Sequence, residues 1–208
     1  MEDNVTGCAG GESVDDIRCD HGKEGNTQMI SREEYEKART RAASFMQEAG
    51  IRVSDRELLS MDVADFGLDN LSVEGAQIVS MVETDQIAMR VIVLFPGQTE
   101  PEHWHTGFDG YAGKQETLRV VSGELYLYLP GRDTVCRGRV PKGQEQYYTA
   151  REEHVLKPTD TITMPPMQKH WFQAGPEGCV LYTVSTLAVD AKDPFSNPHI
   201  VRKTIIIG

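Results

Sequence analysis

Two histidines one residue apart, His103 and His105, precede a lysine and a glutamate with the same spacing, Lys114 and Glu116. Residues two apart in a β-strand point to one face, so each pair is expected to project its side chains together. Neutral imidazole is the commonest side-chain metal ligand, and a carboxylate completes many divalent-metal shells. A third histidine, His170, follows a Pro-Pro turn in TMPPMQKHW. These residue types indicate a metal site, provided that the fold brings the three segments together.

The elements that must position these side chains begin with two helices. Ser31 followed by Glu34 is a capping-box signature, and apolar residues then recur at helical spacing until Gly50 ends the pattern. Ser54 with Glu57 repeats the signature. We therefore expect one long and one short helix near the N-terminus.

From about Val73 the apolar residues alternate as they do in strands. A turn is expected at Ser122–Gly123, and a Pro-bracketed loop and one last strand are expected in DPFSNPHIVRKTIIIG. Many short strands after two helices predict a β-sandwich or barrel with a helical prefix. The expected strands are VEGAQIVSMVET, QIAMRVIVLF, LRVVSGELYLYLPG, QYYTA, EEHVLK, TITMP, HWFQA and CVLYTVSTLAV.

The chain divides into three expected parts. Residues 1–28 lack an apolar period and are interpreted as a disordered tail, in which Cys8, Cys19 and His21 lack the paired spacing of structural zinc. Residues 29–72 are expected to form the helical segment, packed on the β-rich part at 73–208. That last part ends in the loop and final strand.

Composition narrows the class of protein. The 208 residues carry a net charge of -11, which argues against nucleic acid or an anionic membrane as a partner. No apolar run is long enough to span a bilayer, and the first residues lack the apolar core of a secretory signal. Four cysteines without close pairing favour a reducing compartment, so we expect a cytoplasmic protein.

The spacing of these residues resembles the two motifs of the cupin family. The first motif is matched by Gly97, five residues, the two histidines around Trp104, then Glu116, six residues and Gly123. In the second motif, Pro165 and His170 are in register. The resemblance covers about residues 90–175. It implies a mainly β fold, the small double-stranded β-helix barrel of jelly-roll type, with the helical segment N-terminal to it. It also implies one divalent metal, held by His103, His105, Glu116 and His170.

Within cupins the chain resembles the bacterial D-lyxose ketol-isomerases over about residues 29–202. The matching stretches are LFPGQTEPEHWH, GKQETLRVVSGELYLYLPG, MPPMQKHWFQAGPEG and DPFSNPHIVR. The resemblance implies a homodimeric, metal-dependent aldose–ketose isomerase that interconverts D-lyxose and D-xylulose, and often D-mannose and D-fructose. Manganese is the metal it implies, although histidine and carboxylate ligands also suit Zn, Co, Ni and Fe.

The isomerase hypothesis suggests roles for further residues. Moving a carbonyl between C1 and C2 creates an enediolate, and Lys114, on the Glu116 face, could donate to its developing oxyanion. Lys114 and Glu116 are thus the catalytic candidates. Asp109, Tyr111 and Arg202 are candidates for substrate binding; the alternatives are a lid without specific contacts for the first two, and an ordinary ion pair for Arg202.

One position departs from the family pattern. The strand after EGC usually carries a glutamate before the Ser-Ser or Ser-Thr pair, and Thr183 stands there in this sequence. Threonine cannot act as a carboxylate base. Two alternatives therefore stay open, an iron-dependent cupin dioxygenase and a non-catalytic cupin that binds sugar or metal. The lysine in GKQE favours the isomerase, because it suits an enediolate and has no obvious use in oxygen activation.

Overall fold

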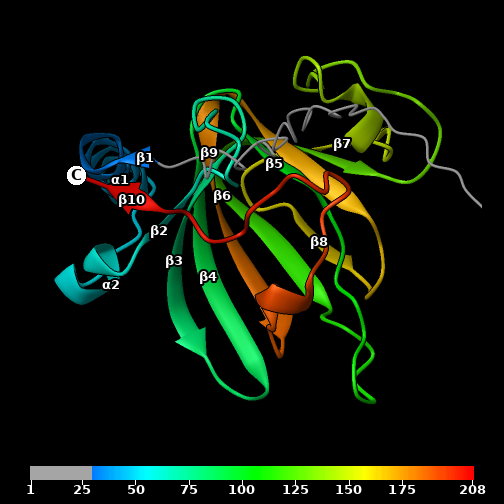
Figure 1. Ribbon diagram of the computed structural model, residues 1–208, viewed down its shortest axis with the longest axis horizontal. Helices are drawn as coiled ribbons and strands as arrows, with labels where there is room; N and C mark the ends of the chain where they lie inside the picture. The colour runs from blue at the N-terminus through cyan, green and yellow to red at the C-terminus, as the bar shows by residue number, and fades with distance from the viewer. Residues whose placement is uncertain (1–29) are drawn as a thin grey trace, which may run out of the picture.

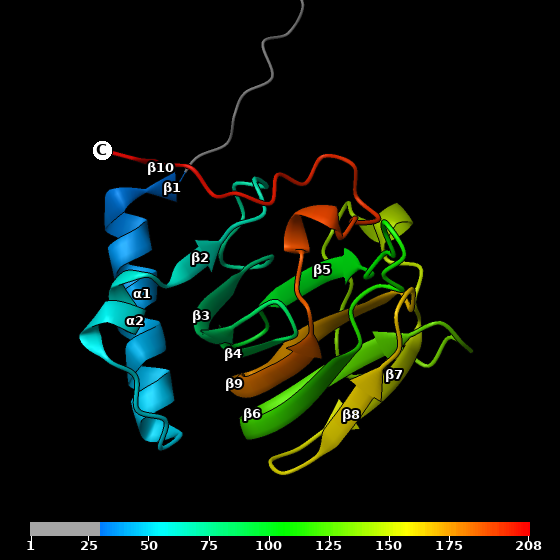
Figure 2. The same ribbon diagram turned by 90° about the horizontal axis from the view of Figure 1, so that it is seen from below.

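The computed structural model describes residues 30–208, a mainly β structure with a long helix near its N-terminus (Figure 1). The tail expected at residues 1–28 lies outside the described residues. None of the helices within residues 30–208 is long and apolar enough to cross a membrane. Figures 1 and 2 show curved strands that wrap around a common interior, with the long helix standing on one side of them.

Eight strands form one sheet in the order β2-β3-β4-β9-β6-β7, with β5 paired to β9 and β8 paired to β6. Two short strands, β1 and β10, pair in parallel and join the two ends of the described chain. The strands are β1 Ile30–Ser31, β2 Asp62–Ala64, β3 Ala76–Glu83, β4 Ile87–Leu94, β5 Thr99–His103, β6 Glu116–Leu129, β7 Glu152–Leu156, β8 Thr161–Met164, β9 His170–Thr186 and β10 Ile206–Ile207. The helices are α1 Arg32–Glu48, α2 Asp55–Leu59 and the 3-10 turns η1 Glu145–Tyr147 and η2 Asp190–Lys192.

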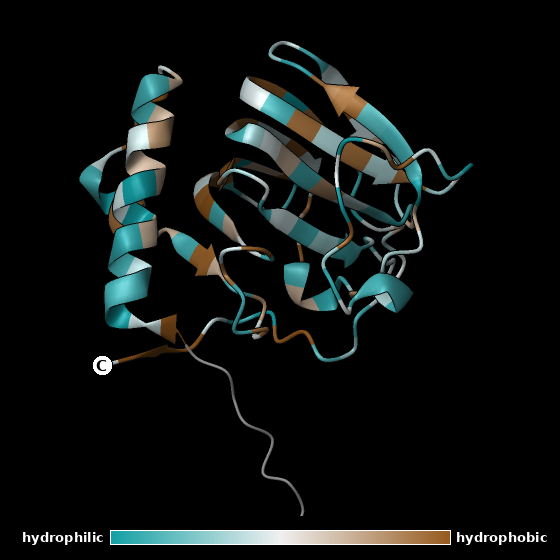
Figure 3. Cartoon of the chain, turned by 90° about the horizontal axis from the view of Figure 1, so that it is seen from above, coloured by the Kyte–Doolittle hydropathy of each residue, from teal (hydrophilic) through white to brown (hydrophobic). Residues whose placement is uncertain are grey.

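Both predicted helices are confirmed, together with their capping boxes. Ser31 and Glu34 exchange hydrogen bonds at the start of α1, and Ser54 and Glu57 do the same at α2. α1 buries one stripe of its surface, whereas Figure 3 shows mostly polar residues along the rest of the helix. The buried stripe and the outward side chains of β3, β4 and β9 form one apolar cluster, which includes Tyr35, Ala38, Ala42, Met46, Val79, Val91, Val93 and Val180.

The expected turn at Ser122–Gly123 is wrong, and so is the expected break between HWFQA and CVLYTVSTLAV. Both segments are continuous, as β6 and β9. Gly123 (φ 77°) and Gly178 (φ 80°) face each other, and a Cβ on Gly123 would lie 2.0 Å from the Gly178 carbonyl oxygen. The ladder between the strands shifts register at this point. Glycine therefore bends the paired strands together here rather than reversing the chain.

The expected strand at QYYTA is also wrong. Residues 146–150 lie in η1 and the loop after it. The Tyr148 hydroxyl donates to Glu74, and the backbone N–H groups of Thr149 and Ala150 donate to the buried carboxylate of Glu102. A side-chain carboxylate thus takes the hydrogen bonds that a neighbouring strand would otherwise accept.

The inside of the barrel has an apolar part and a polar part. Side chains of β4, β6 and β9 fill the apolar part, among them Leu94, Leu118, Leu125, Leu127 and Leu181. The polar part lies where β5 ends and where β6 and β9 begin. These three chain segments carry the histidines and the glutamate of the predicted metal site.

Candidate metal centre

Three strand ends bring the four predicted metal ligands together. His103 ends β5 and is the register partner of His170, which begins β9, while Glu116 begins β6. His105 follows two residues after β5. The ligand atoms of the four side chains all lie within 4.8 Å of one another, and all four residues are buried. This group could bind a metal ion.

Each histidine of the cluster is oriented by a hydrogen bond from its Nδ1. The Nδ1 atom of His103 donates to the Pro101 carbonyl (2.8 Å), that of His105 donates to Asp193 (2.8 Å), and that of His170 donates to the Gln168 carbonyl (2.9 Å). These bonds fix the tautomer that leaves Nε2 as the lone-pair nitrogen.

The Nε2 atoms face the cluster. His105 Nε2 lies 3.2 Å and His170 Nε2 lies 3.8 Å from Glu116 Oε2. His170 Nε2 is buried without a hydrogen-bond partner among the described residues. An orphaned imidazole nitrogen inside a protein is costly, and a cation at the centre would satisfy it. The donor set therefore fits a divalent metal.

Burial and charge favour the protonation states that metal ligands need at His103, His170 and Glu116. Burial, with the neighbouring histidines, holds the pKa of His103 well below its usual value, and burial lowers the pKa of His170 to about 4. Burial alone would raise the pKa of Glu116, but Lys114 and His105 outweigh it and hold that pKa well below its usual value. Burial opposes the charge of His105, but its hydrogen bonds to Asp193 and Glu116 outweigh that effect and raise the pKa of this imidazole. At neutral pH His103 and His170 therefore offer lone-pair nitrogens and Glu116 a negative oxygen, whereas a metal would displace a proton from His105.

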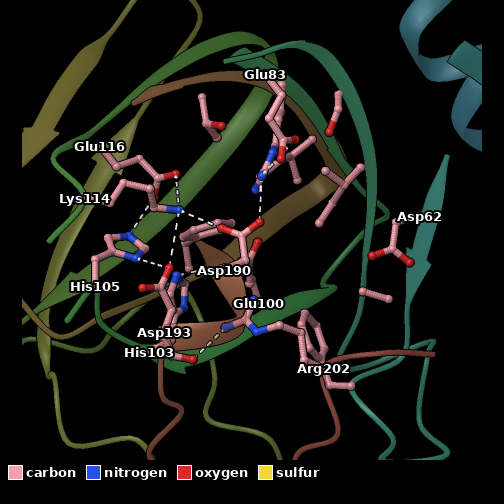
Figure 4. Close-up of a pocket in the computed structure, with 18 of the residues that line it drawn as sticks. Asp62, Glu83, Glu100, His103, His105, Lys114, Glu116, Asp190, Asp193 and Arg202 are labelled. Carbon is pink, nitrogen blue, oxygen red and sulfur yellow. Dashed lines mark hydrogen bonds and ion pairs between the residues drawn. The ribbon is translucent and has the colours of Figure 1, made fainter. Parts of the chain in front are cut away.

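Lys114 is buried beside the cluster among three carboxylates (Figure 4). Its Nζ lies 3.4 Å from Glu116 Oε1, 3.4 Å from Asp190 Oδ1 and 3.7 Å from Asp193 Oδ2. Burial opposes its charge, but these carboxylates outweigh that effect and raise the pKa of the ammonium. Asp190 is held from its other side by Arg90 at 2.6 Å. A fixed, protonated ammonium therefore stands next to the predicted metal ligands.

A cavity of about 270 Å³ opens beside these groups. Its volume suits one small ligand, because pockets for drug-sized molecules begin at about 300 Å³. Strands, the α2–β2 loop and η2 contribute its walls. It is lined by Ser60, Asp62, Ala64, Phe66, Ile78, Ser80, Glu83, Arg90, Ile92, Glu100, His103, His105, Lys114, Glu116, Phe172, Thr183, Asp190, Asp193 and Arg202.

The other predicted substrate contacts divide into two groups. Arg202 lines the cavity, donates to the Asp193 carbonyl at 2.8 Å and packs over Phe195. Asp109 and Tyr111 are not among the lining residues of the cavity. The Tyr111 hydroxyl is bonded to Thr186 and Leu187 instead, so it ties its loop to the segment after β9.

Several cavity residues were missed by the sequence analysis, namely Asp62, Glu83, Arg90, Glu100, Asp190 and Asp193. Glu100 is three residues from His103, an odd spacing that in a regular strand places side chains on opposite faces. β5 has a register shift between the two residues, which brings Glu100 into the cavity with His103. Burial, with the nearby Glu116, raises the pKa of Glu100 to about 7. Among the described residues, no lysine or arginine lies within ion-pair distance of Glu100. The sequence itself therefore did not indicate that this side chain lies in the cavity.

Three curated proteins similar to this chain are named as isomerases of D-lyxose. A D-lyxose ketol-isomerase of Cohnella laeviribosi is 42% identical over 174 residues, which cover 83% of this chain and 96% of that protein. A D-lyxose ketol-isomerase of Thermofilum sp. is 39% identical, with 84% and 97% covered. A D-lyxose/D-mannose isomerase of Thermosediminibacter oceani is 40% identical, again with 84% and 97% covered. No family model matches the chain.

Solved structures with the same fold include an L-ribose isomerase of Cellulomonas parahominis, with a TM-score of 0.74 at 17% identity. The match covers 86% of this chain and 99% of that one. The L-ribose isomerase of Acinetobacter sp. DL28 in complex with L-ribose gives a TM-score of 0.71 at 17% identity, with 86% and 99% covered. At this identity the likeness shows the fold alone, and it confirms the predicted cupin barrel with its N-terminal helix.

Proposed function

The chain belongs to the D-lyxose ketol-isomerase family, and from this we propose that it interconverts D-lyxose and D-xylulose at a divalent metal. It is an isomerase, and its relatives support a sugar as its substrate. The name D-lyxose/D-mannose isomerase of one relative supports D-mannose and D-fructose as a second pair. The single observation that carries the proposal is the buried cluster of three imidazoles and one carboxylate beside a protonated lysine, inside a cavity of monosaccharide size.

We assign the metal to His103, His105, Glu116 and His170, with manganese as the expected ion. A divalent ion bound there would supply Lewis-acid stabilisation of the negative charge that isomerisation creates. The chain's own residues prepare the site for it. Pro101, Gln168 and Asp193 orient the imidazoles, and all four ligand side chains are buried.

Lys114 is assigned as the donor to the sugar oxygen that becomes negative. Its ammonium is already held in place, so little reorganisation is needed when charge develops. Arg202 and Asp62 line the same cavity and present a donor and an acceptor for hydroxyl groups of the sugar away from the reacting carbons. Asp109 and Tyr111 remain candidates only for contacts made when their loop moves.

The test is conversion of D-lyxose and D-mannose by the purified chain, first stripped with a chelator and then loaded with manganese. Ketose is expected in the loaded sample and not in the stripped one, and zinc, cobalt, nickel and iron are compared in the same assay. An oxygen electrode on the iron-loaded protein tests the dioxygenase alternative. Sugar binding without ketose or oxygen uptake would favour the non-catalytic cupin and contradict the proposal.

The homodimer and the cytoplasmic location also stand as proposals. Val82, Ile87 and Val184 are exposed apolar side chains on the neighbouring strands β3, β4 and β9, beyond the part that α1 covers. Exposed apolar side chains gathered on one face support contact with a second copy of the chain. Sedimentation equilibrium would measure the mass directly.

A further inference from the structure

One more carboxylate lies against the predicted metal ligands. The Glu100 side chain is 13% exposed, and its Oε2 is buried without a hydrogen-bond partner among the described residues. Its Oε1 lies 3.9 Å from His103 Nε2. A buried carboxylate oxygen without a donor costs stability, so its retention points to a use inside the cavity.

Three other cavity carboxylates are already engaged. Asp190 pairs with Arg90 at 2.6 Å, and Glu83 lies 3.6 Å from the same guanidinium. Asp193 accepts a hydrogen bond from His105 at 2.8 Å. Each of these has a partner that holds it away from a substrate proton.

Two cavity carboxylates remain besides the predicted ligand Glu116. Asp62 is exposed on β2, and Figure 4 shows it across the cavity from Lys114 and Glu116. Glu100 is the one that contacts the ligand cluster. The reacting carbons must lie beside that cluster, so Glu100 is the carboxylate within their reach.

The bulge in β5 is what gives Glu100 this position. Glu100 pairs with Phe172 and His103 pairs with His170, so four residues of β5 are matched by three residues of β9. The extra residue turns both side chains into the cavity, although they are an odd number apart. Bulges are frequent next to active sites because they re-aim side chains in this way.

Thr183 cannot supply the base, so the reaction needs a carboxylate other than the predicted ligand Glu116. It is buried in the cavity wall, with Arg90 and Leu118 as its register partners, and has no group that accepts a carbon-bound proton. Isomerisation nevertheless needs a base that moves a proton between adjacent carbons. An acid elsewhere on the cavity wall has to supply that base.

We propose that Glu100 is the catalytic carboxylate that carries the proton between C2 and C1, a role that rests on the proposed function. Glu100 takes the C2 proton; the electrons of the broken C–H bond form the C1=C2 double bond, and the C1 carbonyl oxygen becomes negative. Glu100 then delivers that proton to C1, the O2 proton moves to O1, and C2–O2 becomes the carbonyl. Atoms and electrons balance without a co-reactant.

The test compares Glu100→Gln with wild type and with Glu177→Gln, which changes an exposed residue at the bend of β9. Glutamine keeps the size of the side chain but accepts no proton. We expect kcat for D-lyxose to fall at least about 100-fold in Glu100→Gln, as for removal of a general base. Metal content by elemental analysis and D-lyxose affinity by calorimetry should stay within about threefold, since the side chain is neither a ligand nor an anchor. Glu177→Gln should match wild type in all three.

Two results would overturn the assignment. Activity of Glu100→Gln within about tenfold of an active wild type would show that another group moves the proton, and a parallel loss of metal would make Glu100 a ligand instead. Thr183→Glu in the wild-type background should not raise kcat, because the base is already present; a tenfold gain would mean that wild type lacks one. A wild type without isomerase activity under any metal would instead remove the proposed function, and the role of Glu100 with it.

Discussion

Replacing His105 by alanine is expected to abolish most metal binding and, with it, sugar isomerisation. His105 Nε2 faces Glu116 at 3.2 Å in the ligand cluster, and its Nδ1 is fixed by Asp193. Loss of groups that merely orient a metal ligand costs about 10- to 100-fold in affinity, so loss of the ligand itself should cost more than about 100-fold. Elemental analysis should find less than about one-tenth of the wild-type metal.

His154→Ala is the matched control, because His154 lies on β7 in a partly exposed position outside the cavity. It should keep wild-type metal content and activity. Far-UV circular dichroism of His105→Ala should remain β-rich, since the barrel core is built from other residues. Full metal occupancy in a folded His105→Ala would remove His105 from the ligand set.

Lys114→Ala should lower kcat by about 100-fold or more, the loss seen when one oxyanion donor is removed. Metal content should stay near that of wild type, because the ammonium is not a ligand and its positive charge opposes a nearby cation. The discriminating measurement is therefore kcat together with elemental analysis on the same preparation. A loss of metal equal to the loss of activity would show that Lys114 supports the ligand cluster rather than the substrate.

One further variant separates the charge of Lys114 from its position, and another serves as a control. Lys114→Ala leaves Glu116, Asp190 and Asp193 close together without their cation, which costs stability in a buried site. Lys114→Arg keeps the charge but changes the donor geometry, so it should fold and still lose most activity. Lys142→Ala, at an exposed lysine, controls for general surface effects.

The sequence predicted the cluster of three histidines and one glutamate because its signal is local and periodic. Each part of the cluster occupies one short segment, and the spacing within the motifs indicated a metal site. The three parts are His103 with His105, Lys114 with Glu116, and His170. The helix starts at Ser31 and Ser54 were predictable for the same reason, since a capping box involves residues three apart.

The missed features depend on contacts between distant segments. A glycine read alone indicates a turn, and only the pairing of Gly123 with Gly178 makes it a bend in two long strands. Glu100 escaped prediction because a bulge reverses the alternation from which faces are assigned. Asp190 and Asp193 gave no signal of their own, because their partners Arg90 and His105 lie about 90 to 100 residues away in sequence.

We expect a divalent metal at this cluster to make the barrel a sugar isomerase, and a metal titration can show whether it does. Chelator-stripped protein would receive increasing manganese while D-xylulose formation from D-lyxose and bound metal per chain are measured in the same samples. Activity should rise from zero in proportion to bound metal and reach its plateau at one ion per chain. Ketose formation by metal-free protein, or none at one ion per chain, would show that isomerisation does not depend on a metal at this cluster.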